Sequence, residues 1–411
     1  MGRRARENRT GGVRERRTIC SFCGRPETDT TTLVAAPSAS ICARCVSECA
    51  HILERSPDDA ERPVLAELPT PHGIHDFLDQ YVIGQTETKR SLAVAVYNHY
   101  KRLTLRPSPG EPEIRKSNVL LIGPSGAGKT LLAETLARFL EVPFASVDAT
   151  SLTEVGYVGD DVDVIAERLV QAAGGDVARA ARGIVYIDEI DKLAVRADNP
   201  VHGRDISGEG VQQALLRLLE GARVPVPEAR RSPRAPVPEL DTREVLFICG
   251  GAFEGLETNV AVRVNGGGIG FRAEVASPEV PVGLLGEALQ PIDLTAYGLI
   301  PELVGRLPLA TVLDPLDEAV LTRILTEPRH ALVRQYQALF AMDGCRLEFT
   351  PEALRVVARQ ALASGTGARA LRGVLERVLL EPMFAASAGR LDVDAEAVLA
   401  ACQSEPSRRV V

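Results

Sequence analysis

One run of residues constrains the fold of this chain more than any other feature. Residues 123–130 read Gly-Pro-Ser-Gly-Ala-Gly-Lys-Thr and match the pattern G-x-x-x-x-G-K-[ST] of a phosphate-binding loop. An apolar, strand-like run comes before this loop and a helical stretch follows it, which is the context that the pattern requires. The loop therefore predicts an α/β domain with a phosphate site between a strand and a helix.

Further apolar runs alternate with helical stretches through the middle of the chain. They are nearly unbroken, which is typical of parallel strands that are buried on both faces. The alternation predicts a doubly wound parallel sheet that binds ligands at the carboxyl ends of its strands. The predicted strands are Asn118–Ile122, Phe144–Asp148, Ile184–Asp188, Val245–Cys249 and Leu309–Leu313.

The phosphate-binding loop assigns chemistry to particular residues. Its glycines let backbone N–H groups wrap the phosphates of ATP, and the following helix adds a favourable dipole. We expect Lys129 to meet the β- and γ-phosphates and the hydroxyl of Thr130 to ligate Mg²⁺. The predicted nucleotide-binding residues of the loop are Gly123, Pro124, Ser125, Gly126, Ala127, Gly128, Lys129, Thr130 and Leu131.

The apolar run Ile184–Asp188 ends with an acid, Asp188, and a second acid, Glu189, follows it directly. We expect Asp188 to help hold Mg²⁺, directly or through water. Glu189 would polarise the attacking water, which requires a carboxylate within hydrogen-bond reach. Carboxylates at strand ends are common, so this interpretation depends on the phosphate-binding loop.

Hydrolysis also needs positive charge where negative charge develops on the γ-phosphate, from the same chain or from a neighbour. Arg306 in Gly-Arg-Leu-Pro and Arg369 in Gly-Ala-Arg both fit this role. Their sequence context alone is equally compatible with ordinary surface arginines.

Five of the eight cysteines lie between Cys20 and Cys49. Two C-x-x-C pairs separated by 18 residues form a four-cysteine zinc pattern. A module this small buries little core, so the metal would supply folding free energy, and four thiolates leave no open position for catalysis. The predicted Zn²⁺ ligands are Cys20, Cys23, Cys42 and Cys45, with Cys49 left over.

Composition separates the chain into segments and limits its partners. With 411 residues it has room for two or three domains, and its net charge of −8 argues against nucleic acid as the main partner. No apolar run is long enough for a membrane span and no secretory signal is evident, so we expect a cytoplasmic protein. The predicted segments are a basic tail (1–17), a zinc module (18–55), a linker (56–70), a large α/β ATPase domain (71–314), a smaller, mainly helical domain (315–403) and a short tail (404–411).

Seven arginines in residues 3–17 stand against two glutamates. We interpret this stretch as a disordered, solvated tail, with a contact to RNA or to a partner as the alternative.

Taken in order, these motifs resemble the ClpX family, the ATP-binding subunits of the Clp protease, which are AAA+ proteins. The resemblance runs from about residue 18 to residue 400. It rests on the cysteine pattern, the phosphate-binding loop and the runs Tyr-Val-Ile-Gly-Gln (81–85), Gly-Tyr-Val-Gly (156–159) and Ser-Gly-Glu-Gly-Val-Gln-Gln (207–213). It implies a homohexameric unfoldase that threads proteins through a central pore into a peptidase.

The resemblance also implies roles for residues that their own context does not assign. Tyr157 and Val158 are similar to the substrate-gripping pore loop, and Arg204 to the charged residue of a second pore loop. Arg306 resembles a finger that reaches a neighbour's nucleotide, and Arg369 a sensor within the subunit. The remaining implied residues are Val82 and Ile83 at the adenine pocket and Ile269, Gly270 and Phe271, which dock on a ClpP-type peptidase.

Two departures from the family pattern stand out. The basic loop at the pore entrance reads Arg230-Arg231-Ser232, without histidine, within a proline-rich stretch (222–243) that contains too many prolines for a helix or central strand. At the end of the fourth strand, where many AAA+ proteins place a polar sensor, Cys249-Gly250-Gly251 offers no candidate.

Three alternatives remain open beside an unfoldase that feeds a peptidase with tagged or unfolded substrates, helped by adaptors. A stand-alone remodelling chaperone would use the same ATPase without a peptidase. A clamp loader or helicase would need a basic or aromatic nucleic-acid motif, and none is seen beyond the tail. An inactive scaffold is opposed by the intact loop and acids.

Overall fold

The computed structural model divides into two compact units, Met1–Glu67 and Leu68–Val411, and each is described by itself. The residues that it describes are 19–26, 33–35, 39–54, 68–105, 114–153, 160–195, 208–229, 236–264, 282–385 and 388–403.

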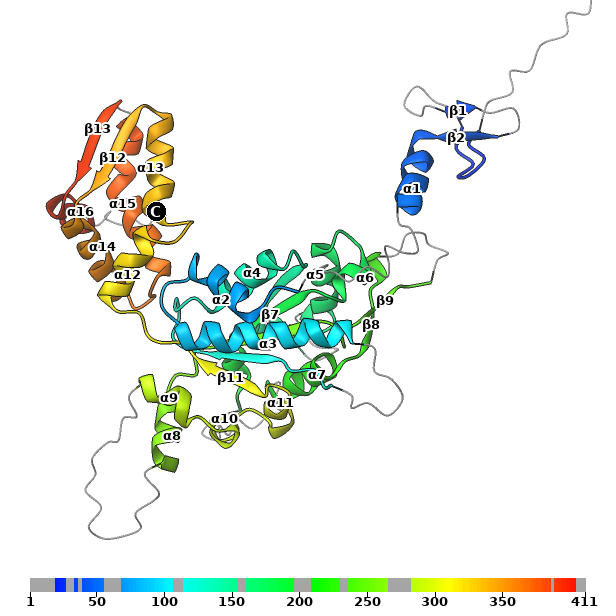
Figure 1. The fold of residues 1–411 in the computed structure, drawn as a ribbon, viewed down its shortest axis with the longest axis horizontal. Coiled ribbons are helices and arrows are strands. Elements are labelled where there is room, and N and C mark those ends of the chain that lie inside the picture. Colours follow the sequence, from blue (N-terminus) through cyan, green and yellow to red (C-terminus); the bar gives the residue numbers. More distant parts are fainter. Residues whose placement is uncertain are drawn as a thin grey trace, which may run out of the picture. The chain divides into compact units, whose positions relative to one another are not determined.

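A parallel five-stranded sheet organises the larger unit (Figure 1). All five strands predicted from the sequence are present, with ends that differ by one or two residues at most, and the predicted fold class is confirmed. From one edge to the other the strands are β11 (Leu309–Val312), β3 (Val119–Ile122), β10 (Leu246–Gly251), β7 (Ile184–Asp188) and β4 (Phe144–Asp148).

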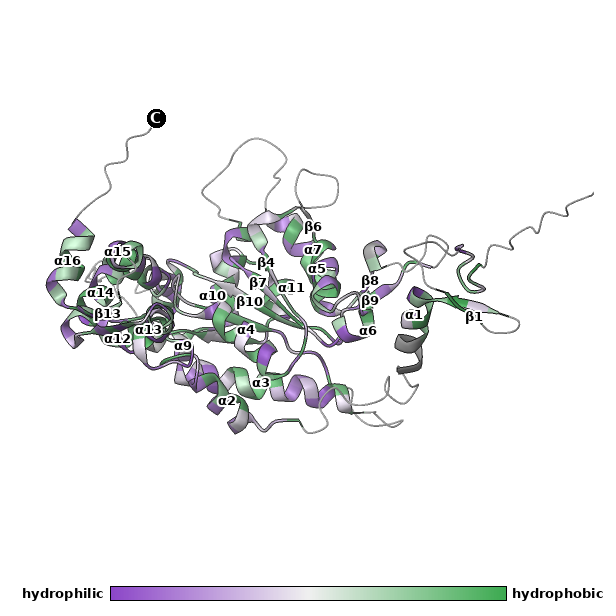
Figure 2. Cartoon of the chain, turned by 90° about the horizontal axis from the view of Figure 1, so that it is seen from above, coloured by the Kyte–Doolittle hydropathy of each residue, from purple (hydrophilic) through white to green (hydrophobic). Residues whose placement is uncertain are grey.

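The sheet is the core of this part of the molecule because helices cover its apolar strands. Every residue of β3 and β10 is buried. Helix α3 (Thr86–Thr104) packs against β11, α4 (Lys129–Phe139) against β7 and β10, and α5 (Val164–Ala172) against β4. In Figure 2 the strands are coloured mainly as hydrophobic, whereas the helices alternate between the two colours, as amphipathic helices do.

Shorter elements complete this part of the chain. The proline-rich stretch contributes a small antiparallel pair outside the main sheet, β8 (Arg223–Pro225) with β9 (Glu239–Asp241), where proline is tolerated. The other elements are α2 (Pro71–Asp79), β5 (Leu152–Thr153), β6 (Asp160–Asp161), α6 (Val177–Ala180), α7 (Gly208–Glu220), α8 (Leu256–Val264), α9 (Val282–Ala288), α10 (Pro291–Tyr297) and α11 (Pro301–Gly305).

Three consecutive glycines (266–268) predict a loop over residues 263–286, but helices occupy both ends of this stretch. Helix α8 continues to Val264, and α9 begins at Val282. Residues 265–281 lie outside the described residues.

The C-terminal part has a hydrophobic core of its own, built mainly by helices, as predicted. It also contains two strands that the sequence did not predict, β12 (Cys345–Phe349) and β13 (Gly389–Val393), which pair in parallel (Figure 1). The helices around them are α12 (Glu318–Thr326), α13 (Leu332–Met342), α14 (Pro351–Ala363), α15 (Arg369–Ala385) and α16 (Ala395–Gln403).

The smaller unit contains the cysteine-rich module. An antiparallel pair, β1 (Leu33–Ala35) with β2 (Ser40–Cys42), leads directly into helix α1 (Ala43–Glu54). Its buried cluster consists of Cys20, Cys42 and Cys45 with Leu33 and Ile41 packed against them. So small a core cannot offset the entropy of ordering the chain without help.

None of the helices in the described parts of either unit has the length and apolar character that crossing a bilayer demands.

Candidate functional site

The phosphate-binding loop joins β3 to α4 in a conformation that depends on glycine. Gly128, with φ +105°, ends the loop just before α4, and few other residues adopt that backbone. Lys129 is only 8% exposed, and its Nζ donates to the carbonyl oxygens of Gly123 (2.5 Å) and Pro124 (3.0 Å). Within the described ranges this buried ammonium group donates to neutral carbonyls alone, so it has the charge and donors that a phosphate needs and the loop fits a nucleotide.

A cavity of about 390 Å³ opens beside this loop. Arg369, the first residue of α15, reaches it from the C-terminal part of the chain. Its Nη1 donates to the Ser125 hydroxyl (3.3 Å), and its Nη2 lies 4.0 Å from Asp188 Oδ2. The cavity is lined by Gly126, Gly128, Lys129, Thr130, Leu131, Ala368 and Arg369.

Close packing holds the two parts of the chain together at this cavity. A Cβ atom added to Gly126 would collide with the carbonyl oxygen of Thr366, in the segment that leads into α15. Gly126 is therefore needed for its backbone conformation (φ +77°) and for this close approach. Residues 244 positions apart, Ser125 and Arg369, meet across the same cavity.

Asp188 lies at the carboxyl end of β7 and is held from three sides. The hydroxyl of Thr130 donates to its Oδ2 (3.4 Å). The backbone N–H of Glu189 and the hydroxyl of Tyr186 both donate to its Oδ1, each at 3.0 Å. The predicted Mg²⁺ ligands Thr130 and Asp188 are thus brought together by the fold.

Glu189 has an exposed side chain and a left-handed backbone conformation, with φ +56°. Such a conformation is uncommon for a residue other than glycine and is often found at functional sites. It turns the chain sharply after β7, so the carboxylate does not continue the alternation of the strand. Among the described residues, the Glu189 carboxylate accepts none of the hydrogen bonds that hold Asp188.

Burial and the nearby carboxylates shift the pKa of Lys129 in opposite directions. Burial lowers the pKa of its ammonium group, while the nearby carboxylates, Asp188 first and then Asp191 and Glu189, oppose that effect. The guanidinium of Arg369 acts in the same direction as burial. Two cations and three carboxylates thus lie around one loop, which is typical of a site for a charged ligand.

Sequence analysis missed two residues that support the acids. Asp191 is buried and accepts hydrogen bonds from the backbone N–H groups of Ala252 (3.1 Å) and Phe253 (3.3 Å), just after β10. Tyr186 packs inside the sheet, and burial and then the charge of Asp188 raise its pKa, so its hydroxyl remains a donor. Tyr186 lies two positions before Asp188 and therefore faces the same side of β7, which was a readable signal.

The predicted adenine strip lies close to the loop. Val82 and Ile83 are buried, and a Cβ built on Gly128 would lie 4.0 Å from Val82 Cγ1. Next to them the side-chain amide of Gln85 makes two 2.8 Å hydrogen bonds, to the N–H and the carbonyl of Asp314. These bonds attach the strip to the segment that connects β11 with the C-terminal helices.

Arg306 is not brought to this cavity. It caps α11, and its guanidinium forms an ion pair with Glu220 at the end of α7, with Nε donating at 2.8 Å. The side chain is 45% exposed, so the pair is a weak one that a better partner can replace.

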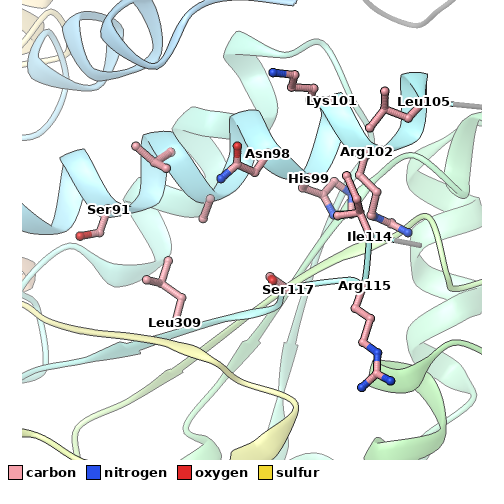
Figure 3. A pocket seen from close by; sticks show the side chains of 12 residues that line it. Ser91, Asn98, His99, Lys101, Arg102, Leu105, Ile114, Arg115, Ser117 and Leu309 are labelled. Atoms are coloured by element: carbon pink, nitrogen blue, oxygen red, sulfur yellow. The ribbon is translucent and has the colours of Figure 1, made fainter. Parts of the chain in front are cut away.

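Another cavity, of about 460 Å³, lies along α3 (Figure 3). His99, in its lining, is buried, and its Nε2 donates to the Glu244 carbonyl oxygen (3.0 Å). Burial, followed by the charges of Arg102 and Lys116, lowers the pKa of His99 to about 3. None of the predicted site residues lines this cavity. It is therefore separate from the nucleotide chemistry.

The four predicted zinc ligands, Cys20, Cys23, Cys42 and Cys45, form a cluster in which all Sγ atoms lie within 4.8 Å of one another. Burial opposes ionisation of Cys20, but hydrogen bonds from backbone groups of Cys23, Cys42 and Phe22 lower its pKa to about 6. The Cys42 thiol and then burial raise the pKa of Cys45. Four thiolates at this separation require a cation, and a tetrahedral set of thiolates fits Zn²⁺.

Other predicted residues lie outside the described residues. They are the pore residues Tyr157, Val158 and Arg204, the docking residues Ile269, Gly270 and Phe271, and the basic run 230–232.

Comparison with known proteins indicates the same kinds of domain as the fold and the site. Residues 18–55 match the ClpX C4-type zinc finger family, residues 114–310 the AAA domain (Cdc48 subfamily), and residues 316–396 the C-terminal, D2-small domain of ClpB protein. The chain is 46% identical over 378 residues to the "ATP-dependent Clp protease ATP-binding subunit ClpX" of Porphyromonas gingivalis, covering 90% of this chain and 92% of that one. The chain belongs to the ClpX family.

A second ClpX relative supports the same conclusion. The protein of that name from Treponema denticola is 47% identical over 385 residues, covering 92% of this chain and 91% of that one. The resemblance inferred from the motifs is thus confirmed. As a ClpX-family protein with an AAA domain, the chain is an ATPase with an N-terminal four-cysteine zinc finger.

Proposed function

We propose that this chain is an ATP-dependent protein unfoldase and translocase, the specificity and ATPase component of a ClpXP-type protease. The observation that carries the proposal is the cavity shared by the phosphate-binding loop and Arg369. A nucleotide bound there would touch both the sheet-containing part and the C-terminal helices. Binding and hydrolysis would therefore change how these two parts meet, which is how chemical energy can become motion.

The proposed cofactors are ATP and Mg²⁺ at this cavity and Zn²⁺ at the cysteines. Lys129 would hold the β- and γ-phosphates, Thr130 and Asp188 would hold Mg²⁺, and Val82 with Ile83 would line the adenine pocket. Mg²⁺, when bound, neutralises charge on the phosphates. Glu189 would orient a water and accept its proton.

Two arginines would complete the site. Arg369 would sense the γ-phosphate from within the subunit, since it already contacts Ser125 and approaches Asp188. Arg306 would exchange its exposed partner Glu220 for a neighbouring subunit's nucleotide. This exchange accounts for the position of Arg306 away from the nucleotide cavity of its own subunit. It also supports a ring of subunits, which we propose to be a homohexamer.

The remaining roles follow from membership of the ClpX family. Tyr157 and Val158 would grip substrate in the pore, with Arg204 on a second loop. Ile269, Gly270 and Phe271 would dock on a ClpP-type peptidase, where several weak contacts in a ring add up by avidity. Tagged or unfolded proteins and their adaptors would be the partners, in the cytoplasm.

Degradation of a stably folded, tagged reporter tests this function. We expect the reporter to be lost only when the protein, a ClpP-type peptidase and ATP are all present. ATP consumption with an intact reporter would favour a stand-alone remodeller instead. Leaving out the peptidase and adding a trap for unfolded protein separates these two outcomes.

Tyr157→Ala is expected to keep ATPase activity and to slow unfolding of the reporter by about tenfold, equivalent to roughly 1.4 kcal/mol in the barrier. The aromatic ring would grip any side chain, and alanine removes it. Tyr157→Phe is the matched variant and should unfold the reporter at close to the wild-type rate. Equal unfolding rates for the alanine variant and the wild type would remove Tyr157 from the pore.

A further inference from the structure

The end of β10 lacks the polar side chain that many AAA+ proteins place there, because Cys249 is buried and two glycines follow it. The register pairs Ile248 of β10 with Tyr186 of β7, so Gly250 lies two residues further toward the carboxyl edge. This edge is where the phosphate-binding loop and Asp188 lie.

The space that a side chain of Gly250 would fill is taken by Tyr186. A Cβ atom on Gly250 would collide with the Tyr186 hydroxyl and stand 2.8 Å from Cζ of its ring. Gly250 does not have the positive φ that demands glycine elsewhere in the chain. The reason for glycine at this position is therefore the room that it leaves for a hydroxyl from the adjacent strand.

That hydroxyl donates to Asp188 Oδ1 at 3.0 Å. The other carboxylate oxygen of Asp188, Oδ2, faces Thr130 (3.4 Å) and Arg369 (4.0 Å). The Tyr186 hydroxyl and the backbone N–H of Glu189 thus share one oxygen of Asp188 and leave the other toward the cavity. Its ring is fully buried, so the hydroxyl is held rigidly.

We propose that Tyr186 is a positioning residue of the ATPase site, whose hydroxyl replaces the missing polar side chain at the end of β10 and orients Asp188 toward Mg²⁺. This inference rests on the proposed function of Asp188 and Thr130. Hydrogen bonds to metal-ligating carboxylates typically change metal affinity or activity by about 10–100-fold.

Tyr186→Phe tests the proposal, because phenylalanine keeps the packed ring and removes only the hydroxyl. We expect the Mg²⁺ concentration for half-maximal ATPase activity to rise about tenfold. Binding of Mn²⁺ to the full-length protein with a non-hydrolysable ATP analogue, followed by electron paramagnetic resonance, should weaken by a similar factor. Affinity for the analogue in EDTA should stay at the wild-type value.

Tyr100→Phe is the matched control, since Tyr100 is also buried and its hydroxyl donates to the Arg182 carbonyl oxygen (3.0 Å), away from the site. It should leave Mn²⁺ affinity unchanged. Gly250→Ala should displace the Tyr186 hydroxyl, since the added Cβ would collide with it, and should weaken Mn²⁺ binding.

The outcomes separate this inference from the proposed function. Wild-type Mn²⁺ affinity in a folded Tyr186→Phe protein would overturn the positioning role while leaving the ATPase site intact. An equal loss in Tyr100→Phe would also overturn it, because the effect would then be general. A wild-type protein whose ATP affinity did not depend on Mg²⁺ would instead refute the proposed metal site itself.

Discussion

Glu189→Gln is expected to reduce ATP turnover by about 10²–10⁴-fold, the usual contribution of general acid–base catalysis. Glutamine has the size and shape of glutamate but cannot take a proton from the attacking water. The exposed carboxylate follows Asp188 directly and is turned out of the strand by its left-handed backbone. The loss should appear in single-turnover hydrolysis, with affinity for ATP close to that of the wild type.

Glu141→Gln provides a control of the same chemistry. Glu141 is likewise exposed and has a positive φ of +55°, but it follows α4 and lies outside the cavity. It should hydrolyse ATP at the wild-type rate. Retained hydrolysis in Glu189→Gln would exclude Glu189 as the base, and so would a loss of ATP binding that accounts for the whole effect.

Local patterns in the sequence were sufficient to predict the large sheet. Its strands are short, mainly apolar runs, and the three central ones, β3, β10 and β7, are buried on both faces, which leaves little alternative to a parallel sheet. The phosphate-binding loop and the two C-x-x-C pairs were equally readable, because their function depends on fixed spacing along the chain.

The small parallel pair β12–β13 could not be predicted from local patterns in the sequence. Each strand is only five residues long, and most of its positions are exposed or half-buried, so neither shows a continuous apolar run. The two strands are separated by α14 and α15 along the chain. Their pairing is a consequence of tertiary packing, which outweighs weak local preference.

The contacts that shape the site are also long-range. Arg306 and Arg369 were both predicted to act on a nucleotide, and their contacts come from the fold: Arg369 reaches Ser125, while Arg306 pairs with Glu220. The Tyr186 side chain fills the space beside Gly250, and this contact depends on the strand register between β7 and β10. A single sequence does not specify that register.

The zinc module should respond to loss of its metal more strongly than any other part of the chain. Structural zinc contributes about 10–16 kcal/mol of apparent binding free energy in small zinc-finger peptides, and that energy is also folding energy. Here the buried cluster is formed by three of the ligands themselves, with Leu33 and Ile41 against them. Without the metal, little apolar surface would remain to hold β1, β2 and α1 together.

Cys45→Ser in the full-length protein should therefore abolish stoichiometric zinc, measured by elemental mass spectrometry. Amide hydrogens of α1 should exchange at rates close to those of an unfolded chain. The ATPase rate should not change, since the nucleotide site lies wholly in the other compact unit, Leu68–Val411. Chelation of zinc from the wild-type protein should produce the same exchange pattern.

Cys49→Ser is the matched control, because Cys49 lies one helical turn after Cys45 on α1, is half-buried and does not belong to the four-thiol cluster. It should retain one zinc per chain and the protection of α1. Loss of zinc in this variant would mean that the ligand set is wrong. Full protection of α1 after chelation would show that packing alone folds the module, and its small core gives no physical basis for that result.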